Sequence, residues 1–200
     1  FRPENLNYPY SPVKARQLLA EAGYPEGRGL PVIEMWSSVR SEALLVEDRL
    51  TQEYLREVGI EARFEYLLDW PQFQKKFQLG LLPLFKYSWE ADIPDPDNIL
   101  ASLFHSQSPN NVFNYASPQV DDLIARAQGE RDYEKRITLY SEAQRLVMED
   151  APILLLSSLA YERAFQPYVR NYEAKAIGDH YFSLKRVWLD RGETAAGEME

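Results

Sequence analysis

The sequence has 200 residues, of which 45% are hydrophobic and 26% are charged, and these ordinary globular values exclude a disordered or low-complexity chain. Lys and Arg number 22 and Asp and Glu number 31, so the formal net charge is −9, and no basic cluster favours nucleic acid as a partner. Cysteine is absent and there are two histidines, which excludes thiolate sites and imidazole-rich metal sites. We therefore expect no metal and no other cofactor.

No apolar run approaches the ~20 residues of a membrane-spanning helix. The chain begins with Phe1 and shows neither an initiating Met nor a signal peptide. We expect it to be a piece of a longer protein.

Helices and strands alternate in the first half of the chain, and capping residues mark their starts. Ser11 followed by Pro12 is a typical helix start, and Asp69 caps a later helix. We predict strands over residues 32–36, 60–66 and 82–89, and helices over residues 12–22, over 41–58 and after 69. Apolar side chains recur along one side of the 41–58 helix at Ala43, Val46, Leu50 and Tyr54.

The second half begins with helical patterns. Short helices are expected near residues 97–104 and 118–127, and a long helix over 133–149. Strands are expected over 153–159, 161–168 and 181–189, and the acidic tail over 191–200 is expected to fray. Strand–helix–strand units of this size predict an α/β layer structure that binds ligands at the carboxyl ends of its strands.

The most unusual stretch is the loop over residues 85–98, which places a strand end and an indole beside four acids and two prolines. Asp before Pro is common in turns, and Asp95 or Asp97 is a typical cap for the following helix. Asp92 has no such explanation. A carboxylate that rigid prolines hold beside Trp89 suits a primary ammonium group, which the acid pairs and the indole face attracts.

Three other interpretations of these residues have less support. Calcium fits poorly, because counting from Asp92 the positions that need Gly and Glu in an EF-hand loop hold Asp97 and Leu103. A hydrolase that uses the loop acids would need two carboxyl groups facing one cavity. The adjacent His105 and Ser106 form no recognisable nucleophile motif. A purely structural domain, kept soluble by its acidic surface, remains the third possibility.

The acid-rich loop is one of several segments that are similar in sequence to a known protein family. The chain resembles the family 5 extracellular solute-binding proteins, the oligopeptide, dipeptide and nickel receptors of ABC importers. The resemblance runs over residues 10–160 and rests on matches in order at 12–24, 55–60, 69–73, 89–98, 103–106, 110–111, 115–124 and 149–153.

The resemblance implies a fold and a division of the chain. The fold would be the C-terminal lobe of a two-lobed, type II periplasmic-binding-protein-like structure, with a mixed sheet flanked by helices. Residues 1–160 would form the ligand-binding lobe, and residues 161–190 would be strands that return toward an N-terminal lobe missing from this chain.

The resemblance also implies a function and a site. The protein would be a non-enzymatic receptor that binds a small peptide or another amine-bearing solute in the cleft between its lobes. Asp92 would neutralise the ammonium group, and residues 86–90 would bond the peptide backbone as an added strand. The substrate-binding residues implied are Asp92, Trp89, Lys86, Ser88, Glu90 and Trp70, with Lys86 near the ligand carboxylate.

The family further implies a membrane ABC permease as partner and a periplasmic or other extracytoplasmic location, either soluble or lipid-anchored. A receptor for a sugar or a nickel complex stays open as an alternative, as does the carboxylate hydrolase.

Overall fold

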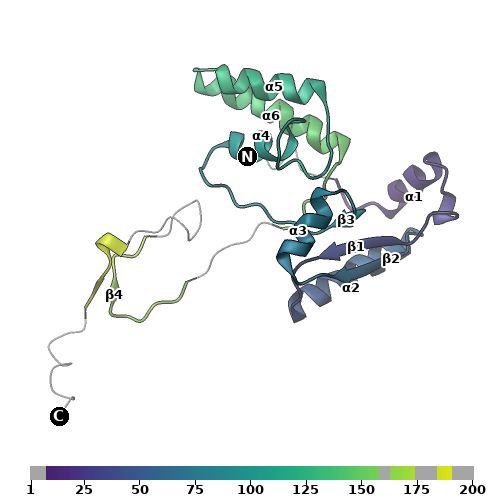
Figure 1. The fold of residues 1–200 in the computed structure, drawn as a ribbon, viewed down its shortest axis with the longest axis horizontal. Helices are drawn as coiled ribbons and strands as arrows, with labels where there is room; N and C mark the ends of the chain where they lie inside the picture. Colours follow the sequence, from purple (N-terminus) through teal and green to yellow (C-terminus); the bar gives the residue numbers. More distant parts are fainter. Residues whose placement is uncertain (1–7, 158–162, 174–183, 191–200) are drawn as a thin grey trace, which may run out of the picture.

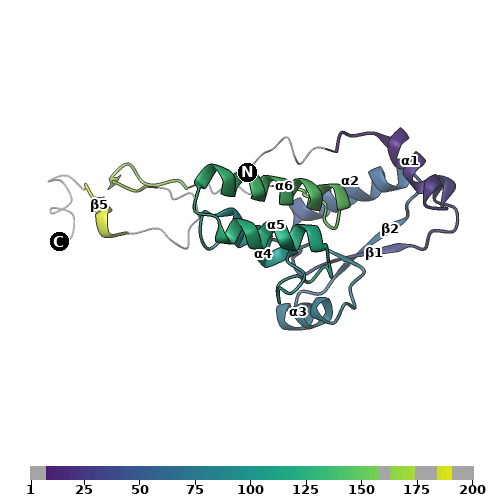
Figure 2. The ribbon, with the colours of Figure 1, turned by 90° about the horizontal axis from the view of Figure 1, so that it is seen from above.

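The computed structural model describes residues 8–157, 163–173 and 184–190. A parallel sheet with strand order β2-β1-β3 is formed by β1 (Ile33–Ser37), β2 (Ala62–Tyr66) and β3 (Leu84–Phe85). Helices α2 (Glu42–Glu57) and α3 (Trp70–Gln78) connect these strands and cover opposite faces of the sheet (Figures 1 and 2). The N-terminal region is therefore a three-layer α/β unit.

Side-chain alternation along the strands explains the two faces. Trp36 and Phe85 point to one side and pack with Phe73 and Phe77 of α3, which are almost completely buried. Residues one position along, such as Lys86, point to the other side and meet α2. The sheet is thus covered by aromatic rings on one face and by a polar helix face on the other.

The capping roles expected of Ser11 and Asp69 are confirmed, and Ser41 is a further cap. The side chain of Ser11 accepts a backbone hydrogen bond at the start of α1 (Pro12–Glu21), and Ser41 and Asp69 do the same for α2 and α3. After α1, a short 3-10 turn (Pro25–Gly27) touches the end of α2. Gly27 and Gly59 both have positive φ there, and a Cβ on Gly59 would lie 2.4 Å from the Glu26 carbonyl oxygen.

Three helices form a separate bundle, which lies above the sheet in the view of Figure 1. They are α4 (Pro96–Phe104), α5 (Pro118–Gly129) and α6 (Tyr133–Asp150). Their shared core contains the completely buried residues Val120, Ile124, Ala127 and Ala143, together with Leu100, Leu103, Phe104, Leu123, Tyr140 and Val147. This bundle follows the acid-rich loop directly and therefore supports it.

A small antiparallel pair, β4 (Val169–Arg170) and β5 (Trp188–Leu189), lies away from the rest of the described chain in both views (Figures 1 and 2). A 3-10 turn (Leu184–Arg186) precedes β5. The parallel and antiparallel strands form two separate sheets rather than one mixed sheet. None of the described helices is long and apolar enough to cross a lipid bilayer.

Several predicted elements differ from those observed. The structure has no strand at three places where one is predicted: residues 86–89 of the 82–89 strand, residues 153–157 and residues 163–168. Residues 158–162 and the tail over 191–200 lie outside the described residues. The apolar stripe of α2 does not face the core, because Val46, Leu50 and Tyr54 are about half exposed. Asp48 of the same helix, with 3% of its surface exposed, faces the sheet instead.

Candidate functional site

The carboxyl ends of the three parallel strands meet at one edge of the sheet. Arg40 follows β1, Trp70 follows β2, and residues 86–92 follow β3. The backbone N–H of Lys86 still donates to the Trp36 carbonyl oxygen at 2.8 Å, after which the chain leaves the sheet. The sequence-predicted site residues therefore come together at the edge where open α/β sheets bind their ligands.

An aromatic row lies along this edge. The rings of Trp70 and Tyr87 stack with centroids 6.5 Å apart, and Tyr87 lies 6.4 Å from Trp89. Trp70 is 45% exposed and Tyr87 is 37% exposed, while buried Phe77 supports both rings from below. Burial raises the pKa of the Tyr87 hydroxyl above its ordinary value. The row offers apolar surface that the sheet core does not use.

Asp92 lies at the end of this row. Its side chain is exposed, and its carboxylate forms neither a hydrogen bond nor an ion pair with any residue in the described part of the chain. Its backbone N–H donates to Asn98 Oδ1 at 3.1 Å, and the same oxygen accepts a longer bond of 3.4 Å from Trp89 Nε1. An available carboxylate beside a half-buried indole is the arrangement that the sequence predicts.

The other acids of the loop are engaged within the protein. Both carboxylate oxygens of Asp95 accept hydrogen bonds of 2.8 Å from Arg136 on α6, and these bonds lower the pKa of Asp95. Asp97 accepts from Tyr140 at 2.7 Å and from Gln128 at 2.9 Å. These contacts fix the first turn of α4 against the helical bundle, and they distinguish Asp92 from its neighbours.

Lys86 is also engaged. Its ammonium lies 2.6 Å from Glu47 Oε1 and 2.5 Å from Asp48 Oδ1, and Tyr66 donates to the other Asp48 oxygen at 2.6 Å. Burial by itself lowers the pKa of Lys86, but the bonds to Asp48 and Glu47 outweigh it and raise this pKa above its usual value. The structure gives Lys86 a partner in the fold and does not support its predicted contact with a ligand carboxylate.

Ser88 and Glu90 are exposed on the segment between β3 and α4. β3 is an edge strand, since β1 occupies one side of it and no described strand pairs with the other. The backbone groups of Tyr87, Ser88 and Trp89 make no hydrogen bond to another described residue. This segment can therefore accept an added extended chain.

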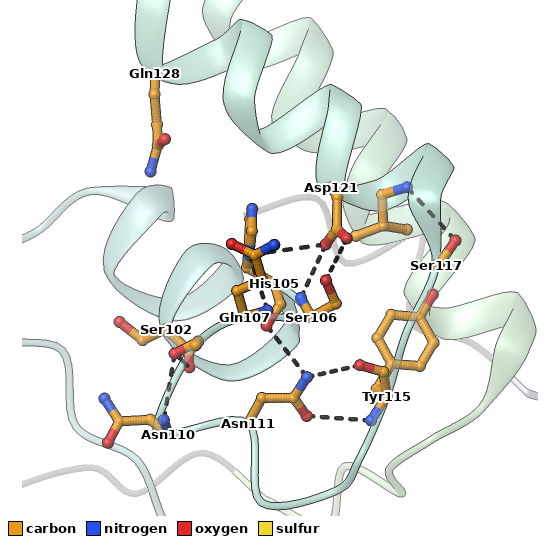
Figure 3. A network of polar contacts seen from close by, with 12 residues as sticks. Ser102, His105, Ser106, Gln107, Asn110, Asn111, Tyr115, Ser117, Asp121 and Gln128 are labelled. Carbon is orange, nitrogen blue, oxygen red and sulfur yellow. Dashed lines mark hydrogen bonds and ion pairs between the residues drawn. The ribbon is translucent and has the colours of Figure 1, made fainter.

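Arrangements for catalysis or metal binding are not formed by the predicted residues. No group of three or more acids and histidines in residues 8–157, 163–173 and 184–190 is placed to hold a metal ion. The Ser106 hydroxyl donates to Asp121 at 2.5 Å, and His105 Nδ1 accepts a backbone N–H from Gln107 (Figure 3). Ser106 thus bonds to the Asp121 carboxylate and not to His105, so these two residues do not form the Ser–His pair of a nucleophilic site.

The polar network around His105 organises the loop that joins α4 to α5. Asn111 donates to the carbonyl oxygens of His105 and Tyr115 and accepts the N–H of Tyr115 (Figure 3). These contacts account for the His105, Ser106 and Asn111 motifs as elements of the fold.

A groove of about 550 Å³ lies elsewhere, between α2 and β2, and is lined in part by Arg49, Gln52 and Phe64. None of the predicted site residues lines it. The predicted site is instead an open surface at the carboxyl edge of the sheet.

Sequence reasoning missed three residues near the site. Tyr87 was not singled out, although it alternates with Phe85 and Trp89 along one face. Arg40 lies at the same edge over the Tyr66 ring, 5.4 Å from its centroid, and has no ion-pair partner among the described residues. Asp48 had no visible signal, because its partner Lys86 lies 38 positions away.

Comparison with known proteins identifies the chain's relatives. The family model described as bacterial extracellular solute-binding proteins, family 5 Middle, matches residues 2–111. The dipeptide-binding protein of Escherichia coli K12 is 29% identical over 186 residues, covering 88% of this chain and 34% of the relative. Di/tripeptide-binding protein 3 of Pseudomonas aeruginosa UCBPP-PA14 is 31% identical, covering 80% of this chain and 30% of the relative.

A solved structure agrees with these matches. The ABC transporter-associated periplasmic binding protein DppA from Helicobacter pylori, in complex with the peptide STSA, is 33% identical, with a TM-score of 0.63. The match covers 72% of this chain and 28% of that protein. The chain thus spans about a third of the length of the relatives it matches. The predicted α/β fold class is confirmed, and the chain belongs to the family 5 bacterial extracellular solute-binding proteins.

Proposed function

We propose that this chain forms one wall of a receptor that binds short peptides, or another solute with a primary amine, and delivers them to an ABC permease. The observation that carries the proposal is the carboxylate of Asp92 at the carboxyl edge of the sheet, which has no partner among the residues that the structure describes. The relatives named as dipeptide-binding and the neighbour solved with a peptide support the same class of ligand.

In the proposed complex, the ligand ammonium pairs with Asp92 and lies against the Trp89 indole, which provides apolar area and a cation-attracting face. The peptide backbone bonds, as an added strand, to the backbone groups of residues 87–89, which make no hydrogen bond within the described part of the chain. Trp70 and Tyr87 contact a ligand side chain, and exposed Ser88 and Glu90 flank the bound chain.

The opposite end of a peptide carries a carboxylate, which requires a cation. Lys86 is neutralised by two acids of α2, whereas the guanidinium of Arg40 is exposed at the same edge and has no described ion-pair partner. We therefore assign the carboxylate contact to Arg40 rather than to Lys86. A guanidinium also matches a carboxylate better than an ammonium does, because it can donate two parallel hydrogen bonds.

The open site requires a second wall, and we propose that the other lobe of the receptor supplies it. Residues 154–156 are leucines that are at least half exposed, and the small β4–β5 sheet lies apart from the bundle. We propose that these segments contact that lobe. Such a receptor is non-enzymatic and works outside the cytoplasm, in the periplasm or at the outer surface of the membrane.

The experiment that tests the proposal compares ligands that differ only at the amino terminus. A panel of dipeptides with free amino termini is titrated into the whole receptor by calorimetry, alongside the same dipeptides with N-acetyl caps. The proposal predicts that acetylation removes the ammonium and weakens binding by a few hundredfold or more. Equal affinity for both sets would contradict it, and binding of a sugar or nickel complex alone would favour the non-peptide alternative.

A further inference from the structure

We propose that Asn98 is a positioning residue for the ammonium site. This inference rests on the proposed function, since it assigns a role in presenting Asp92. Asn98 is half-buried in the first turn of α4, and its side-chain oxygen accepts from both the Asp92 backbone N–H and Trp89 Nε1. One amide oxygen thus joins the two residues that we place on the ligand ammonium.

The chemistry of the neighbours fixes which end of the amide faces the loop. Both neighbours are N–H donors, so Asn98 must present its oxygen to them. Asn98 lies three residues after the helix cap Asp95, at the position where Glu or Gln often bonds back to the cap N–H. Here the Asn98 side chain does not bond to the N–H of the cap Asp95 but to the N–H of Asp92, three residues before the cap. The contact therefore serves the loop rather than the helix end.

The turn that carries Asn98 is itself held firmly. Asp95 is bonded through both oxygens to Arg136, and Asp97 is bonded to Tyr140 and Gln128. These contacts anchor the turn to α5 and α6. Among the described contacts, Asn98 is the side chain that connects this anchored turn to the exposed end of the loop. Without it, Asp92 and Trp89 would lose their direct hydrogen bonds to the bundle side of the site.

The predicted consequence is a loss of affinity that depends on the Asn98 acceptor. In the whole receptor, with the dipeptide Ala-Phe as probe, Asn98→Leu should weaken binding about 5- to 50-fold, the effect of losing one or two hydrogen bonds. Asn98→Asp keeps an acceptor oxygen. The Nδ2 group of Asn98, which this variant removes, donates to no described residue. This variant should therefore bind within about threefold of the wild type.

A double variant separates a positioning role from general damage. If Asn98 acts through Asp92, adding Asn98→Leu to Asp92→Asn should weaken binding little further, because the carboxylate it positions is already gone. An Asn98→Leu variant that binds Ala-Phe like the wild type would overturn the inference. So would a double variant in which the two losses multiply in full.

A second measurement needs no ligand. The Asp92 amide should exchange with solvent about tenfold or more slowly than the Ser88 amide, which has no described acceptor. Asn98→Leu should remove this protection and Asn98→Asp should keep it. Equal exchange at Asp92 and Ser88 in the wild type would overturn the role of Asn98, whatever the affinities. Retained affinity in Asp92→Asn alone would instead refute the proposed function and leave the exchange result to judge Asn98.

Discussion

Replacing Lys86 with Met tests whether this lysine belongs to the fold or to the ligand site. Its side chain is 15% exposed, and its ammonium contacts Asp48, whose side chain is 4% exposed, and Glu47, whose side chain is 42% exposed. The substitution would leave Asp48 charged and buried, with the Tyr66 hydroxyl as its remaining hydrogen-bond donor. We expect a large loss of stability and little direct change in ligand affinity.

The magnitude follows from the burial of the partners. Removing one member of a buried ion pair costs about 3 to 5 kcal/mol, because the other charge stays desolvated. Glu47 adds little to this figure, since it remains largely solvated and surface pairs contribute about 0 to 1 kcal/mol. Replacing Asp48 with Leu in the same chain removes the stranded charge, so the double variant should recover most of the lost stability.

Urea unfolding followed by circular dichroism measures the free energies of unfolding, and calorimetry at a temperature where the variant is folded measures dipeptide affinity. We expect Lys86→Met to lose stability while its affinity stays within about threefold of the wild type. Unchanged stability together with a large loss of affinity would refute the assignment and return Lys86 to the ligand carboxylate.

Two further stability predictions follow from other contacts. Arg136→Met should cost about 2 kcal/mol at pH 7. Because Arg136 lowers the pKa of Asp95 below its ordinary value, the difference in stability from the wild type should shrink as acid protonates Asp95, which urea unfolding at several pH values would measure. The exposed-pair control Arg126→Met should change little, and a pH-independent difference would contradict the reasoning. Gly59→Ala should lower the melting temperature markedly, because Gly59 has a φ of +92° and the new Cβ would meet a carbonyl oxygen. Gly129→Ala is the control and should not lower it, since nothing lies within 4 Å of the added Cβ. Equal effects of the two substitutions would contradict this account.

Much of the N-terminal fold could be predicted because its signals are local. Ser11, Ser41 and Asp69 are capping residues within three positions of the N–H groups they bond, and Phe73 and Phe77 bury one face of α3 through simple helical spacing. The position of Asp92 on the loop that follows the third strand was equally visible.

The errors come from contacts between distant residues. The apolar residues along one side of α2 are about half exposed, because the helix turns Asp48 to the sheet, where Lys86 and Tyr66 meet it. The contact between Lys86 and Asp48 joins residues 38 positions apart and has no local signal in the sequence. The apolar run over 153–157 suggested a strand, yet no described strand lies beside it to complete the hydrogen bonds that a strand requires.

The most direct test of the account is calorimetric titration of a free-amine dipeptide into the receptor with Asp92→Asn, beside Asp122→Asn as a control for losing an exposed acid on α5. Loss of the carboxylate leaves the ligand ammonium without its partner, a cost of about 3 to 5 kcal/mol. Affinity should fall by a few hundred- to several thousandfold in the Asp92 variant, and by less than about threefold in the control. Wild-type affinity in Asp92→Asn would contradict the account.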